Sequence, residues 1–70
     1  MKPAVLSELA LELGVNKSKL SFYATMGFFK PISEMGGMNI YDRDEVVKCV
    51  KKIKEQQKKG LSLREIGKTL

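Results

Sequence analysis

The sequence predicts a mainly α-helical domain of four short helices, with a small β-hairpin between the second and third helices. Apolar residues recur at helical spacing in four separate segments, and capping residues precede three of them. The pair Gly36 and Gly37 lies between two short segments that can pair as strands. A chain of 70 residues, 43% of them hydrophobic, is long enough for one small folded domain.

The first two helices are predicted over residues 6–13 and about 17–25. The apolar positions of the first are spaced i, i+3, i+4 and i+7: Leu6, Leu9, Ala10 and Leu13. Gly14 ends this helix, because glycine adopts the left-handed C-terminal conformation at little cost. Asn16 is a suitable N-cap for the second helix. The short connection makes the two helices turn sharply against each other, so residues 6–25 are predicted to form a helix-turn-helix.

Residues 28–41 are predicted to leave the second helix as extended chain and then form the hairpin. Pro31 excludes helix at this point and favours an extended conformation for Lys30. Gly36 and Gly37 supply the turn. A small hairpin that follows a helix-turn-helix is called a wing, so the predicted fold is a winged helix-turn-helix.

The third helix is predicted over residues 43–59 and the fourth over residues 63–70. Asp42 and Glu45 have the spacing of a capping box, and Ser62 and Glu65 repeat it before the fourth helix. The fourth helix is unfinished at Leu70, so the protein is expected to continue beyond this point.

The apolar faces of these elements define an expected core, which consists of Leu9, Leu13, Leu20, Phe22, Phe28, Val50, Ile53 and Ile66. Cys49 lies beside the apolar stripe of the third helix and is expected to act as a small buried hydrophobe. Lysines at positions 48, 51, 52, 54, 58 and 59 fall largely on the opposite side. They indicate a solvated face, with a nucleic-acid patch as the alternative.

Composition excludes several classes of function. The chain has one Cys and no His, which excludes a zinc-type metal site and an internal disulfide and fits a reducing cytoplasm. A chain this small, without an imidazole, argues against an enzyme, and no cofactor is expected. No apolar run is long enough to span a membrane, and no secretory leader is visible. The net charge of +5 permits an anionic partner.

Six segments, in order along the chain, resemble the N-terminal winged helix-turn-helix domain of MerR-family transcription regulators. They cover residues 6–10, 14–17, 20–23, 27–31, 41–46 and 60–66, and the fifth reads Tyr-Asp-Arg-Asp-Glu-Val. The resemblance implies a DNA-binding domain of a prokaryotic regulator in the cytoplasm, associated with the nucleoid. It places the second helix in the major groove of double-stranded DNA and the wing on the flanking backbone.

Nine residues are the candidates for DNA contact: Asn16, Lys17, Ser18, Lys19, Ser21, Tyr23, Lys30, Asn39 and Tyr41. Those on the second helix would present lysine and serine side chains to base edges, unless they are only a solvated basic face. The resemblance implies that the Tyr23 ring packs on the core with its hydroxyl near phosphate; the alternative is a plain core tyrosine. It also implies wing contacts to flanking phosphates or the minor groove.

The chain departs from the family pattern in two places. Ser21 stands where the family usually carries arginine, and Met38 and Asn39 stand where it usually carries tyrosine and arginine. Neither Ser nor Asn replaces the charge of an arginine fork, so a single copy is expected to bind weakly. Useful affinity would then need two copies, through self-association on DNA or dimerisation through residues beyond 70.

A second hypothesis is an interaction module, or an excisionase-like DNA-architecture module, whose wing binds a protein partner. Its motivation is the apolar wing together with the missing arginines. Met35, Met38 and Ile40 are expected to pack beneath the hairpin, and the alternative is an apolar surface for that partner.

Overall fold

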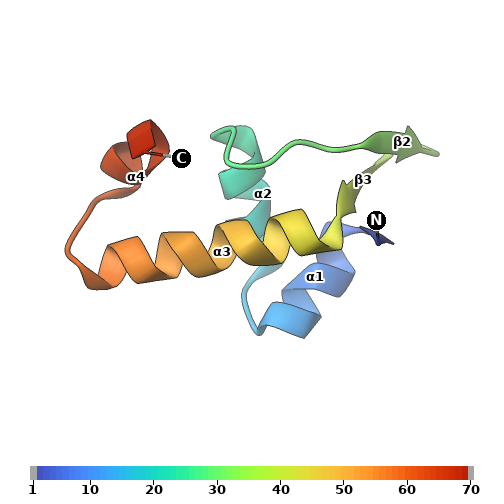
Figure 1. Cartoon of the computed structure of the whole chain (residues 1–70). Helices are drawn as coiled ribbons and strands as arrows, with labels where there is room; N and C mark the ends of the chain where they lie inside the picture. The colour runs from blue at the N-terminus through green and yellow to red at the C-terminus, as the bar shows by residue number, and fades with distance from the viewer. Residues whose placement is uncertain (1, 70) are drawn as a thin grey trace.

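The computed structural model describes residues 2–69, and over this range the predicted fold class is confirmed. The elements are β1 (Pro3–Ala4), α1 (Leu6–Leu13), α2 (Lys17–Thr25), β2 (Ser33–Met35), β3 (Met38–Asp42), α3 (Arg43–Lys58) and α4 (Leu63–Thr69). Figure 1 shows α3 running along the molecule, with α4 packed near its C-terminal end and the hairpin beyond its N-terminal end. Leu70, which the sequence assigns to the apolar face of the fourth helix, lies outside the described residues.

The local signals that delimit α1 and α2 act as the sequence predicts. Gly14 caps α1 in the left-handed conformation with φ 67°. The Asn16 side chain accepts a hydrogen bond from the Ser18 backbone N–H at 2.9 Å and so caps α2. Both caps satisfy backbone groups that the helix itself leaves unpaired, which fixes the tight turn between the two helices.

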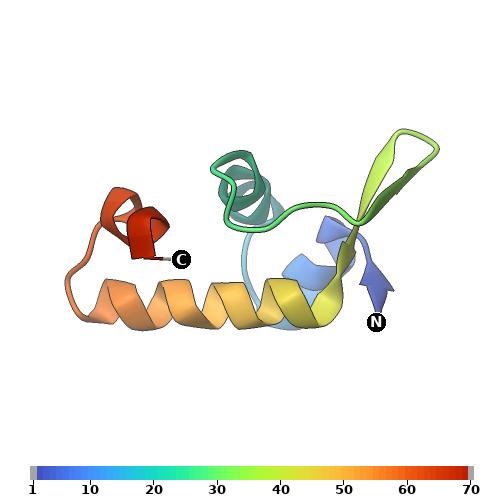
Figure 2. The ribbon, with the colours of Figure 1, turned by 45° about the horizontal axis from the view of Figure 1, so that its top comes forward.

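The strands form a three-stranded antiparallel sheet in the order β1-β3-β2. The hairpin register pairs Met35 with Met38 across Gly36 and Gly37, whose φ angles of 56° and 81° suit a tight two-residue turn. Figure 2 shows this hairpin projecting away from the helices. The sequence did not predict β1, because a two-residue strand is too short to show an alternating pattern.

The N-caps of α3 and α4 are also confirmed, but within residues 2–69 only α4 shows the second hydrogen bond of the predicted capping box. The Asp42 side chain accepts from the Asp44 backbone N–H at 3.2 Å. At α4 the capping box is reciprocal: Glu65 N–H donates to Ser62 Oγ at 3.3 Å, and Ser62 N–H donates to Glu65 Oε1 at 3.4 Å. Among the helices described, none has both the length and the apolar character needed to cross a bilayer.

One core joins the helices to the wing, and its buried members are Leu9, Ala10, Leu20, Tyr23, Phe29, Tyr41, Val46, Val50, Ile53 and Ile66. The expectation that Phe22 belongs to this core is wrong, because its side chain is 50% exposed. Successive helical residues point about 100° apart, and Tyr23 occupies the inward position at 2% exposure. Leu13 and Phe28 pack at the margin of the core.

The expected packing of methionines beneath the hairpin is also wrong. Met35 is 70% exposed and Met38 is 53% exposed, whereas Ile40 is half-buried. The reason is the reach of the wing: the turn between the two methionines stands clear of the helices (Figure 2), so no helix covers its tip.

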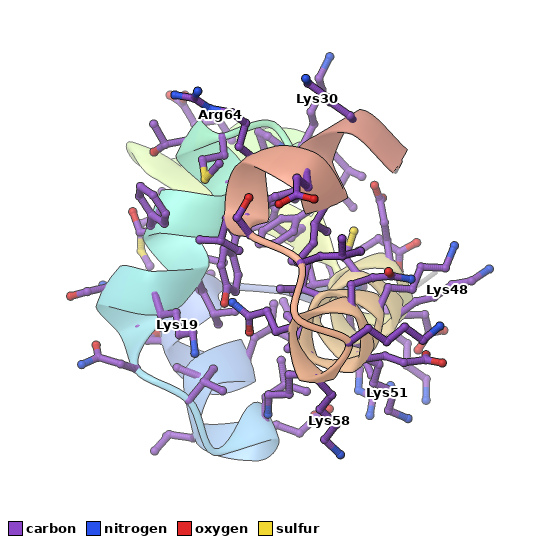
Figure 3. The ribbon with its side chains drawn as sticks, turned by 90° about the vertical axis from the view of Figure 1, so that its left-hand side faces the viewer. Lys19, Lys30, Lys48, Lys51, Lys58 and Arg64 are labelled. Atoms are coloured by element: carbon purple, nitrogen blue, oxygen red, sulfur yellow. The ribbon has the colours of Figure 1, made fainter. Side chains whose placement is uncertain are left out.

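The lysines of α3 are all exposed. Viewed along this helix, Lys48, Lys51 and Lys58 extend from the sides of α3 that face away from α2 (Figure 3). This arrangement favours the solvated face over a continuous patch shared with α2. Cys49 is half-buried, and its thiol donates a hydrogen bond to the Phe28 carbonyl at 3.0 Å.

Candidate nucleic-acid interface

The segment around α2 is cationic and free of acids. Residues 13–33 contain Lys17, Lys19 and Lys30 but no Asp or Glu. Every charged side chain of this segment is therefore a cation, whereas α1 carries Glu8 and Glu12, and α3 carries Asp44, Glu45 and Glu55 beside its lysines.

Two adjoining open hollows lie between α2 and the wing. The first is lined by Lys17 at the start of α2, and the second by Lys30 at the entry to the wing. Ser21, Asn39 and Tyr41 line both. We call these two hollows the α2–wing groove; it brings together five of the nine residues that the sequence proposes for DNA contact.

The groove has a distinct charge pattern. Its shared middle carries the neutral side chains of Ser21 and Asn39, while a lysine stands in each of the two flanking hollows. Thr25 also lines the second hollow, and its hydroxyl donates to the Ser21 carbonyl at 2.9 Å. Sequence reasoning missed Thr25, although its position four residues after Ser21 places it on the same face of α2.

Tyr41 forms the floor of this groove rather than a projecting contact. Its side chain is only 3% exposed, and its ring packs edge-on against Phe29, with centroids 5.5 Å apart. Phe29 is itself fully buried. The wing is thereby anchored to the core at its base, while Asn39, two residues nearer the tip, remains exposed.

Tyr23 is equally buried, at 2% exposure, and its ring packs edge-on against Phe28, with centroids 5.7 Å apart. Within residues 2–69, no buried side-chain oxygen or nitrogen lacks a hydrogen-bond partner. Among the described residues neither tyrosine hydroxyl has a hydrogen-bond partner, so each is accessible to solvent at the surface. A contact from Tyr23 or Tyr41 to DNA can therefore involve little more than the hydroxyl.

The remaining predicted residues lie outside the lining of the groove. Asn16 serves as the cap of α2, and Ser18 is exposed one residue beyond the start of the helix. Lys19 is also exposed, but two residues after Lys17 it points about 200° away around the helix. Figure 3 shows Lys19 well apart from Lys30.

Arg43 is the arginine nearest to the wing in sequence, but ion pairs hold it elsewhere. Its guanidinium pairs with Glu12 of α1 and with Asp44, the latter at 2.8 Å. Hydrogen bonds to Glu12 and then to Asp44 raise the pKa of Arg43 above its already high usual value. The arginine therefore joins α1 to α3 and is not part of the groove lining.

Comparison with known proteins identifies a family for this chain. A family model described as MerR HTH family regulatory protein matches residues 5–70. This span includes α1, α2, the wing, α3 and α4. No curated protein and no solved structure matches the chain.

Proposed function

This chain belongs to the MerR HTH family of regulatory proteins, and from that premise we propose how it binds double-stranded DNA. The family membership supports a DNA-binding domain of a regulator. In our proposal α2 enters the major groove as the recognition helix, and the wing lies along the flanking backbone. In this proposal the domain only binds DNA, so its affinity comes from the positions and charges of its side chains.

The observation that carries this proposal is the α2–wing groove. Lys17 and Lys30 stand in its two hollows, in reach of phosphates along a strand that follows the groove. Ser21 and Asn39 supply short hydrogen-bonding side chains between them. In this arrangement the lysines neutralise backbone charge, and the neutral groups meet sugar or base edges.

The first test is the salt dependence of binding. A fluorescently labelled duplex of mixed sequence is titrated with the protein at about 50 mM and about 200 mM salt. If about four phosphates are neutralised, affinity falls roughly 10²-fold between these conditions. No binding at the lower salt, with the protein shown to be folded, contradicts the proposal.

A pair of lysine variants locates the contact. Lys17→Gln removes a cation of the groove and is expected to reduce the slope of log affinity against log salt by about 0.9. Lys51→Gln removes the same charge from the side of α3 that faces away from α2 (Figure 3) and is expected to leave the slope unchanged. Equal effects of the two substitutions would place the DNA elsewhere.

A second candidate function is favoured by one observation on the wing. Met35 and Met38 pair at its tip and are more than half exposed, and Glu34 is the one charged residue in residues 31–41. Methionines suit adaptable protein contacts, so in this alternative the tip binds a protein while α2 binds DNA.

The double variant Met35→Ser, Met38→Ser separates the two roles of the wing tip. If the tip binds a protein, DNA affinity and its salt slope remain those of the wild type, while any self-association measured by sedimentation on DNA is lost. A fall in DNA affinity assigns the methionines to the nucleic acid instead.

A further inference from the structure

Phe22 is an outward-facing aromatic residue in the middle of α2. The inward positions of this helix belong to Leu20 and Tyr23, which are 0% and 2% exposed, while Phe22 is 50% exposed. Its ring lies 6.4 Å from that of Tyr23, at an angle of 46°. One flank of the phenyl ring is therefore supported by a buried neighbour, and the rest is free to meet a ligand.

Three neighbours of Phe22 on the outward face are short, and two are long, namely Lys19 and the 41% exposed Met26. Ser18 precedes it by one helical turn, and Ser21 and Thr25 lie beside it; all three are exposed. Short side chains let the helix backbone approach a surface closely, and Phe22 is the aromatic side chain that α2 then presents to it. The Thr25 hydroxyl already donates to the Ser21 carbonyl, so its proton is not available to a base.

The charge around this face selects the kind of ligand. Lys17 and Lys19 stand on either side of the outward face, and residues 13–33 contain no acid. Leu11 on α1 differs from Phe22 in this respect: it is 86% exposed, but it lies between the acidic residues Glu8 and Glu12. An exposed apolar group flanked by cations suits a polyanion that carries an apolar group of its own.

In the major groove that apolar group is the 5-methyl of thymine, the one methyl group that the base edges present there beside their hydrogen-bond donors and acceptors. We propose that Phe22 is a specificity-determining residue of α2 and that it packs against a thymine methyl. The inference rests on the proposed entry of α2 into the major groove and adds to it the base that the helix selects.

The test removes the methyl group and nothing else. The probe is the duplex that the wild-type protein enriches from a library of random duplexes, and each thymine in it is replaced in turn by deoxyuridine. Burial of one methyl corresponds to about a four-fold change in affinity. We expect a loss of this size at one or two thymines, with the salt slope unchanged because no charge is altered.

Variants then connect that thymine to Phe22. Phe22→Ala is expected to bind the thymine and deoxyuridine duplexes equally, whereas Phe22→Leu keeps part of the difference. Leu11→Ala, which truncates an exposed apolar residue on α1, is the matched control and is expected to keep all of it. Thermal unfolding confirms that each variant is folded. The comparison of the thymine and deoxyuridine duplexes uses wild-type protein, so it does not depend on the folding of any variant.

The outcomes separate this inference from the proposed function. Equal wild-type affinity for both duplexes, while Lys17→Gln still lowers the salt slope, overturns the role of Phe22 and leaves DNA binding intact. Discrimination that survives in Phe22→Ala also overturns it, as does a library in which no sequence is enriched. Absence of binding to any duplex overturns both proposals. If Phe22→Ala abolishes self-association without changing DNA affinity, the exposed ring serves a second protein copy.

Discussion

The thiol of Cys49 donates a hydrogen bond across 3.0 Å to the backbone carbonyl of Phe28, which links α3 to the segment between α2 and the wing. Burial raises the pKa of this thiol, the charge of Glu45 raises it further, and Lys52 opposes them. The thiol therefore remains protonated and able to donate in neutral solution. A thiolate has no proton to donate, so the bond is lost when the group ionises.

The free energy of unfolding should therefore decrease at alkaline pH, because Cys49 ionises there and its hydrogen bond is lost. The folded pKa lies above that of the unfolded chain, so this contribution is complete below the unfolded value of about 8.5 and is lost as pH rises through the folded pKa. Urea unfolding of wild type and Cys49→Ala at about pH 7 and about pH 10 measures the effect. We expect the advantage of wild type over the variant to shrink at the higher pH; a constant difference would contradict the role of the thiol.

The Arg43 pair with Glu12 should contribute to stability by joining α1 to α3. Glu12 lies near the C-terminal end of α1, where a negative charge is unfavourable to the helix dipole. The dipole alone thus predicts that Glu12→Gln stabilises the protein, whereas the ion pair predicts a small loss that disappears at high salt. Thermal unfolding at low and high salt decides between them.

Glu55→Gln is the matched control for that experiment. Glu55 is exposed near the C-terminal end of α3, and no ion pair is found for it within residues 2–69. The helix dipole disfavours the charge of Glu55 and the lysines three and four residues away favour it, so its replacement should change stability only slightly. A loss of stability equal to that of Glu12→Gln would mean that Arg43 contributes nothing.

Restoring arginine in the α2–wing groove should strengthen DNA binding. Ser21 and Asn39 line both hollows, so Ser21→Arg or Asn39→Arg adds a cation between Lys17 and Lys30. One further phosphate contact steepens the salt slope by about 0.9, so the gain shrinks about three-fold from about 50 to about 200 mM salt. Labelled-duplex titrations measure both quantities. Gln57→Arg adds the same charge on α3, outside the groove lining, and should leave both the affinity and the slope close to those of the wild type.

The sequence predicts most accurately those features that depend on neighbouring residues. The caps at Gly14 and Asn16 need only a few residues of chain, and both are confirmed. The orientation of Phe22 and Tyr23 is different in kind. Both are aromatic and adjacent, so the pattern allows either to face inward, and in the structure Tyr23 is the one that packs against Phe28.

The α2–wing groove likewise depends on contacts between residues that are distant in the sequence. Sequence spacing assigned Lys17, Ser21, Lys30, Asn39 and Tyr41 to two separate elements, and the structure brings these five together. Where the wing meets the core, the rings of Phe29 and Tyr41 pack against each other although they are twelve residues apart in the chain. No local pattern indicates such a contact, so the depth at which Tyr41 is buried could not be read from the sequence.

The two glycines around α4 should respond oppositely to alanine. Gly67 lies inside α4, and a Cβ there would meet the Phe28 ring at 3.6 Å, an ordinary packing distance. Gly67→Ala should therefore stabilise the protein by up to about 1 kcal/mol, because alanine favours the helix and restricts the unfolded chain. Gly60 has φ 87°, so Gly60→Ala should cost about 1–2 kcal/mol although space is available. Urea unfolding measures both changes. A loss of stability in Gly67→Ala would contradict the packing of α4 against Phe28, and a gain in Gly60→Ala would contradict the left-handed conformation of Gly60.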